Sequence, residues 1–240
     1  GSDCTNMKDR ADWLQRRLDL TEKQMKKLIQ QFPLVLSRKS ETSLDPKLEY
    51  LQSRLELTDA KLRSTIIKNP NLLAYSIDEN IEPKLCYLQE RLRLNQTQVA
   101  KIISKQPTIL NMNVERKLEP NIAWLQERLN MTDAQVSKTI WRLPSLLFCS
   151  TSDKMEPNLV WLQKVLKLSN SQTQKIVMRL PHVLAYSICD NMKPTLTWLK
   201  RRLLLKTNSE LATVIEKFPS LLSHSIDTNL EPTLDFYSKA

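Results

Sequence analysis

The residues of this sequence that are best placed to do chemistry are lysines and arginines, and the chemistry they could do is the binding of polyanions. Two positions recur at fixed distances before a repeated proline, six and two residues ahead of it. Nine of these twelve positions are basic and none is acidic, although only 36 of the 240 residues are Lys or Arg. Residues four apart lie on one face of an α-helix, so we expect an exposed row of positive charge. The nine candidates for contact with nucleic acid, called the ladder below, are Lys27, Lys68, Lys101, Lys105, Lys138, Arg142, Lys175, Arg179 and Lys217.

A simpler interpretation is that duplicated segments share a solvated lysine face. Like charges four apart on a helix cost a few tenths of a kcal/mol, so the fold alone does not require them. The neighbouring position, three before the proline, has also diverged freely among the copies. This contrast favours a surface that faces nucleic acid. The diverged residues are Gln30, Ile67, Ser104, Trp141, Met178 and Glu216.

A second basic column follows an aromatic column by four residues, so that each guanidinium could lie over a ring. The aromatic column is typical of a core between repeats, and for the arginines we favour packing plus an ion pair with an acid of the neighbouring repeat. The arginines, with Trp141, are secondary candidates for contact with nucleic acid. Trp141 could stack on a base, but burial between repeats is the favoured interpretation. The aromatic column is Trp13, Tyr50, Tyr87, Trp124, Trp161, Trp198 and Phe236, and the arginines are Arg17, Arg54, Arg91, Arg128 and Arg202, with Val165 at the fifth place of the column, between Arg128 and Arg202.

Catalytic and metal-binding patterns are missing from the sequence. His182 and His224 fall at different places in successive repeats, and the chain has no H-x-x-x-H, C-x-x-C or glycine-rich loop. The four cysteines share no close spacing and are expected to be free thiols of a reducing compartment. We therefore predict a protein that is not an enzyme and that has no catalytic residue, no metal site and no cofactor.

Prolines reveal the elements that must position the ladder. All twelve belong to two series, Pro33, 70, 107, 144, 181 and 219, and Pro46, 83, 120, 157, 194 and 232. The step within each series is 37 residues four times and then 38. A fixed period of roughly 20–50 residues is the signature of a solenoid. Residues 1–2 look like the scar of a cleaved tag, and residues 3–240 form one solenoid, with units 9–45, 46–82, 83–119, 120–156, 157–193 and 194–231 and a partial unit 232–240.

Each unit is predicted to hold two helices and a short 3₁₀ turn, in an all-α superhelical fold. The first, helix A, begins at the second-series proline (residues 83–92 in one copy), with a preceding acid such as Glu82 placed to cap it. The second, helix B, begins at a hinge such as Thr132-Asp133 and ends at the residue before the first-series proline. The leucine-rich turn, PSLL in one copy, follows that proline.

The net charge and the hydropathy of the chain indicate what kind of partner it binds. The formal net charge is +10, which indicates a polyanionic partner. No apolar run approaches the roughly 18 residues of a membrane span, so no membrane association is expected.

The six first-series prolines share the pattern [I/V]-x-x-x-P-x-x-L, as in Ile103/Pro107/Leu110 and Val177/Pro181/Leu184. With helix entries such as LEPNIAWL at residues 118–125, the whole chain resembles the mitochondrial transcription termination factor (mTERF) family. The resemblance implies an α-solenoid that binds nucleic acid along a basic groove. It also implies work in mitochondria, or alternatively chloroplasts, on transcription, RNA maturation or ribosome assembly.

We therefore expect a monomeric organellar factor of gene expression that binds double-stranded DNA, or else structured RNA, and acts in transcription termination or regulation. One alternative is a scaffold whose basic face docks an acidic organellar protein. Another is a reader of single-stranded RNA, although paired prolines do not suit the pentatricopeptide motif.

Overall fold

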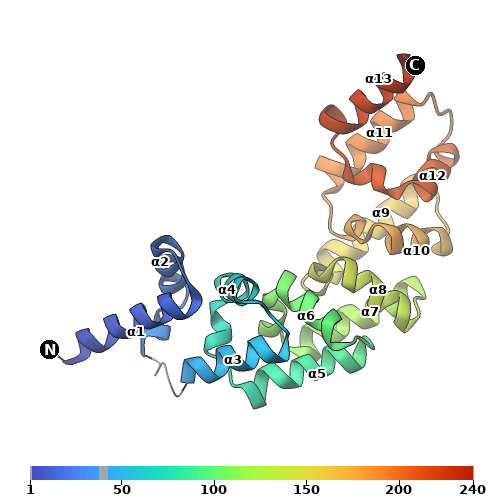
Figure 1. Cartoon of the computed structure of the whole chain (residues 1–240). Coiled ribbons are helices and arrows are strands. Elements are labelled where there is room, and N and C mark those ends of the chain that lie inside the picture. The colour runs from blue at the N-terminus through green and yellow to red at the C-terminus, as the bar shows by residue number, and fades with distance from the viewer. Residues whose placement is uncertain (1, 38–42, 240) are drawn as a thin grey trace. The chain divides into compact units, whose positions relative to one another are not determined.

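Thirteen α-helices make up most of the chain in the computed structural model, which describes residues 2–37 and 43–239 and holds no strand within them. Contacts divide the chain into two compact units, residues 1–114 and 115–240 (Figure 1). The first unit holds α1 (Ser2–Leu18), α2 (Glu22–Gln31), α3 (Asp45–Arg54), α4 (Asp59–Lys68), α5 (Glu82–Arg91) and α6 (Gln96–Lys105). The second holds α7 (Glu119–Leu129), α8 (Asp133–Arg142), α9 (Glu156–Leu166), α10 (Asn170–Arg179), α11 (Lys193–Arg202), α12 (Asn208–Lys217) and α13 (Glu231–Lys239).

Odd-numbered helices are helix A of each repeat and even-numbered helices are helix B. A 3₁₀ turn starts at every first-series proline, as predicted. The all-α solenoid of 37-residue repeats is therefore confirmed. The turns are Pro33–Ser37, Pro70–Leu73, Pro107–Asn111, Pro144–Leu147, Pro181–Leu184 and Pro219–Ser223.

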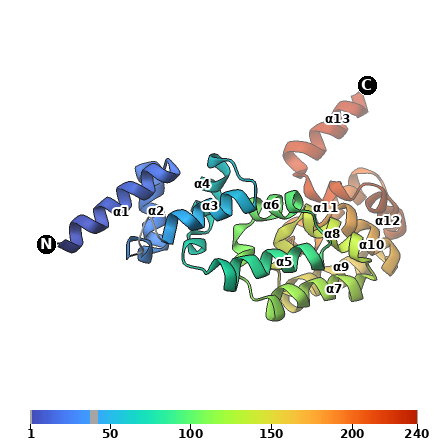
Figure 2. The same ribbon diagram turned by 60° about the horizontal axis from the view of Figure 1, so that its bottom comes forward.

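Within each unit the repeats stack on one another in sequence order (Figures 1 and 2). In the first unit α4 lies between α2 and α6. In the second unit α10 lies between α8 and α12, and α7 and α9 each contact the helix B of the next repeat. No helix in the described part of the chain has the length and apolar character needed to cross a membrane.

Helix B begins and ends where the sequence predicts. Its N-cap side chain, for example Thr132 or Ser169, accepts a hydrogen bond from the backbone three residues on. Its last residue is followed by a C-cap residue directly before the proline, as at Leu143 and Leu180. A residue before proline is pushed out of the α region, so the helix must stop there.

Helix A begins differently from the prediction. The acid before the second-series proline does not cap it, because a five-residue π-helical turn leads directly into the α-helix. In four of the five π turns given below, the cap is a serine seven residues before the proline, as at Ser150, whose Oγ accepts from the Asp153 N–H at 3.1 Å, whereas Asn113 stands at this place before Val114–Leu118. A proline cannot donate the i→i−4 bond, and the wider turn tolerates this loss. The π turns are Ile77–Ile81, Val114–Leu118, Thr151–Met155, Ile188–Met192 and Ile226–Leu230.

Helix A also ends in a left-handed residue, although the chain has no internal glycine to take this conformation. A leucine or methionine follows that residue, buried at five of the six helix ends and half-buried at Leu205, and its N–H bonds five residues back, as from Leu168 to Gln163 O at 3.1 Å. This is a Schellman ending. Burial of the apolar side chain after the turn offsets the roughly 1–2 kcal/mol that a left-handed non-glycine residue costs. The left-handed residues are Asp19, Glu56, Arg93, Asn130, Lys167 and Leu204.

The core consists mainly of leucine and isoleucine side chains, such as Leu88, Leu125 and Ile140. The six members of the aromatic column from Trp13 to Trp198 are half-buried, and Phe236 is exposed. The prediction that this column forms the core between repeats was therefore only partly correct. The polar tips of the column explain this position: Tyr50 donates to Glu82, and Trp198 Nε1 donates to Glu231 Oε2 at 2.5 Å. An amphipathic ring keeps one end buried while the other end meets a carboxylate.

The residue after the second-series proline holds the 3₁₀ turn of its own repeat. Asn158 is 3% exposed, and its Nδ2 donates to the carbonyls of Val183, Leu184 and Tyr186 at 3.3, 3.1 and 2.8 Å. Asn121 makes the equivalent three bonds one repeat earlier. These amides satisfy buried carbonyls that the short turn cannot pair by itself.

We expect Asn158→Ala to lower the free energy of unfolding by about 1–3 kcal/mol, because it leaves buried carbonyls without their donor. Urea unfolding followed by circular dichroism would measure the change. The exposed Ser171→Ala in the next helix serves as the control and should stay within about 0.5 kcal/mol of the unmodified protein. Equal midpoints for the two variants would refute the role of this amide.

Candidate nucleic-acid interface

All nine ladder residues are exposed, as the sequence predicts. In the first unit they lie on the helix B elements α2, α4 and α6. In the second unit they lie on α8, α10 and α12, which are stacked consecutively. Packed helices lie about 8–10 Å apart, so each unit carries cations at short, regular intervals.

The ladder position two before the proline has a structural role that the sequence did not reveal. Lys68 Nζ donates to Ser104 O at 3.2 Å, and the Arg142 guanidinium donates to Met178 O. Arg179 Nη1 donates to Glu216 O at 2.9 Å. Each acceptor lies in the last turn of the next helix B, where carbonyls lack helical partners and the helix dipole is negative. The statement that the fold does not require these charges is therefore wrong for this column.

The ladder position six before the proline makes fewer contacts with the next repeat than the position two before it. Lys175 Nζ lies 3.1 Å from Glu216 Oε1, and this ion pair partly neutralises the ladder on α10. Hydrogen bonds from Gln172 and Lys175 hold the pKa of Glu216 below its usual value. Glu216 occupies the diverged position of the sixth repeat, and its acidic character was the signal in the sequence for this pairing. Lys138, on α8, makes no ion pair within the described part of the chain.

The second basic column forms the ion pairs that the sequence favoured. Arg54 Nε lies 2.9 Å from Glu82 Oε2, and Arg128 Nε lies 2.9 Å from Glu156 Oε1. The hydrogen bond from Arg54 is the main cause of a lowered pKa for Glu82. The acid that fails to cap helix A thus pairs with the arginine of the preceding repeat.

Similar pairs join Arg17 to Asp45 at 2.7 Å and Arg202 to Glu231 at 3.1 Å. Arg91 is half-buried. Trp141 is also half-buried, and its indole nitrogen is covered by protein. These secondary candidates are therefore less available to a ligand than the ladder is.

Among the described residues, no group of three or more His, Cys, Asp or Glu side chains could hold a metal ion. The three cysteines whose side chains are described, Cys86, Cys149 and Cys189, are free thiols.

Comparison with known families gives one match. The mTERF family model matches residues 4–206 and 166–240, which together cover residues 4–240. No curated protein sequence gave a significant match. Members of this family are nucleic-acid-binding factors of organellar gene expression. The matched repeats, the paired prolines and the basic helix B faces lead to one conclusion: the chain belongs to the mTERF family.

Proposed function

We propose that this protein binds double-stranded DNA through the ladder and regulates or terminates transcription in an organelle, the mitochondrion rather than the chloroplast. The observation that carries the proposal is the exposure of all nine ladder cations on helix B elements. Lysine and arginine contacts to phosphates supply most of the affinity of a protein for a nucleic-acid backbone.

A duplex suits this surface better than a single strand does. Single strands are held by aromatic side chains on which bases stack. The aromatic column lies on helix A, and six of its members are half-buried. On the helix B elements, Trp141 has its indole nitrogen covered. Regularly spaced cations on rigid helices match instead the regular phosphate spacing of a double helix.

We propose duplex DNA and not duplex RNA as the ligand, because a factor that ends transcription acts on the DNA template. A protein bound along the phosphate backbone would then obstruct the polymerase without any catalytic step. If the ladder cations contact phosphates, binding should depend weakly on sequence, since phosphate contacts carry no sequence information directly.

Fluorescence anisotropy at physiological salt tests the choice of nucleic acid. Labelled duplex DNA, duplex RNA and single strands of the same sequence and length would each be titrated with the full chain. We expect duplex DNA to bind at least tenfold more tightly than either single strand, and more tightly than duplex RNA. Tighter binding of a single strand would overturn the proposal, and tighter binding of duplex RNA would move the function to RNA maturation.

A further inference from the structure

Two interfaces between successive helix A elements use the same set of three side chains. In the first unit Arg54 bonds Glu82, and its Nη2 donates to Gln89 Oε1 at 2.7 Å. In the second unit Arg128 bonds Glu156, and its Nη2 donates to Gln163 Oε1 at 3.1 Å. An arginine of one repeat thus reaches an acid and an amide of the next.

All three positions differ in the following repeat. Val165 replaces the arginine, Lys193 replaces the acid and Lys200 replaces the amide. Lys200 Nζ instead donates a hydrogen bond to Asn208 Oδ1 at 2.7 Å. Lys193 is exposed, and within the described residues its ammonium group forms no ion pair. All three members of the set are replaced at this one interface, not a single partner. As a result, a lysine stands directly before Pro194, whereas an acid precedes every other second-series proline.

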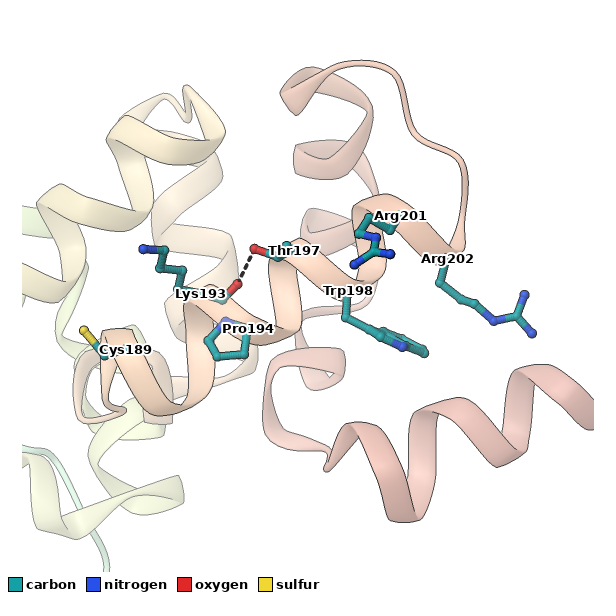
Figure 3. A pocket seen from close by; sticks show the side chains of 7 residues that line it. All are labelled: Cys189, Lys193, Pro194, Thr197, Trp198, Arg201 and Arg202. Carbon is teal, nitrogen blue, oxygen red and sulfur yellow. Dashed lines mark hydrogen bonds between the residues drawn. The ribbon is translucent and has the colours of Figure 1, made fainter.

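A groove of about 760 Å³ opens at this place on α11. Figure 3 shows the lining side chains in order along α11, from Lys193 and Pro194 through Thr197 and Trp198 to Arg201 and Arg202, with the Lys193 ammonium pointing away from Arg201. Lys193 and Arg201 are eight residues apart on α11, so their Cα atoms lie about 12 Å apart along the helix axis. Arg201 is exposed. The groove therefore combines two separated positive charges with an apolar floor.

Carboxylates near the groove are already engaged. Asp190 accepts from the Ser187 hydroxyl at 2.7 Å within the helix cap. Arg202, which also lines the groove, is paired with Glu231 and with Asp235. Among the groove-lining cations, Lys193 and Arg201 form no ion pair with a described residue, whereas Asp190 keeps its negative charge and the Arg202 cluster holds one more carboxylate than guanidinium.

The surroundings favour a short ligand over a long polyanion. The helix A elements before and after α11 carry Glu156 and Glu231 at the place of Lys193. A nucleic acid that ran along helix A from repeat to repeat would meet these carboxylates. An extended peptide advances about 3.3 Å per residue, so two acidic side chains about four residues apart could reach Lys193 and Arg201. An apolar side chain between them would meet Pro194 and Trp198.

We propose that this groove, whose cations are Lys193 and Arg201, is a docking site for an acidic peptide segment of a partner protein, with an apolar side chain between its carboxylates. The site lies on helix A and is separate from the ladder on helix B. It would let the protein hold a protein partner and a nucleic acid at the same time.

A short fluorescent peptide with glutamates on both sides of a central phenylalanine is the probe, and its glutamine counterpart is the reference. We expect the full chain to bind the glutamate peptide at least tenfold more tightly. Lys193→Glu with Arg201→Glu should remove this preference. A second variant, Val165→Arg with Lys193→Glu and Lys200→Gln, rebuilds the ion-paired interface, so it should fold at least as stably and should also lose the preference.

Lys164→Glu with Lys206→Glu changes the net charge equally at two exposed residues outside the groove. This control should keep the peptide affinity within twofold of the unmodified protein. Equal weakening in the control and in the groove variant would overturn the proposal, because net charge alone would then explain binding. Equal affinity of the unmodified protein for the two peptides would also overturn it. So would a loss of duplex DNA affinity in the groove variant as large as the loss of peptide affinity, since the groove would then serve nucleic acid.

Discussion

Reversing the charges of Lys138 and Lys217 to glutamate should weaken the binding of duplex DNA at least tenfold, or about 1.4 kcal/mol. Both lysines are exposed, on α8 and α12 at the two ends of the helix B stack of the second unit. The reversal removes two attractive charges and adds two repulsive ones along the proposed path. Neither lysine has a hydrogen bond or ion pair from its side chain to another described residue. The free energy of unfolding should therefore change by no more than about 0.5 kcal/mol per site.

The control for this variant is Lys164→Glu with Lys206→Glu, which lowers the net charge by the same amount within the same unit. Anisotropy titrations at one fixed salt concentration would compare both variants with the unmodified protein. If the two variants lost affinity equally, net charge alone would govern binding and no path would exist. If neither lost affinity, the alternative of a protein-interaction scaffold would gain support.

Leu125→Ala should lower the free energy of unfolding by about 2–5 kcal/mol, because it leaves a cavity in a packed core. Leu125 is 0% exposed and lies on α7, whose other buried apolar side chains are Ile122 and Leu129. Repeats of a solenoid depend on their neighbours for stability, so a cavity in one repeat should destabilise those that stack on it.

Urea unfolding would measure this loss, with the exposed Glu127→Ala on the same helix as the control. The control should stay within about 0.5 kcal/mol of the unmodified protein. A loss below about 1 kcal/mol for Leu125→Ala would show that this face is not the core of the repeat.

Proline placement explains why the sequence predicted helix B so well. A proline removes a backbone donor and restricts the preceding residue, and both effects are local. The end of α8 at Arg142 and the turn that starts at Pro144 follow from this restriction alone. The threonine cap at Thr132 is equally local, because its hydroxyl accepts from a backbone group three residues away.

The start of helix A was predicted less well, because two signals competed there. Glu156 stands next to Pro157 and resembles a cap, whereas Ser150 caps a π turn that no simple periodicity encodes. A serine seven residues before the second-series proline recurs at Ser76, Ser187 and Ser225, and this was the overlooked signal. The left-handed ends of helix A were hidden where Glu56, Lys167 and Leu204 take this conformation, whereas Asp19 and Asn130 are residue types that favour it.

The ladder shows what sequence alone could say about the site. The four-residue spacing of the two basic positions predicted one exposed row, and the structure agrees with this for all nine residues. The contacts of Arg142 and Arg179 to carbonyls of the next repeat depend on how helices stack, which a single repeat does not encode. Similarly, the pairing of Lys175 with Glu216 joins residues 41 apart in sequence.

The salt dependence of duplex DNA affinity tests the central claim, that ladder cations contact phosphates, most directly. About five phosphate contacts give a slope of the logarithm of the binding constant against the logarithm of salt near −4 to −5. We predict this slope for the unmodified protein and a slope shallower by about 2 for Lys138→Glu with Lys217→Glu, which removes two contacts. A slope shallower than about −1 for the unmodified protein, or the same slope for both proteins, would contradict the claim.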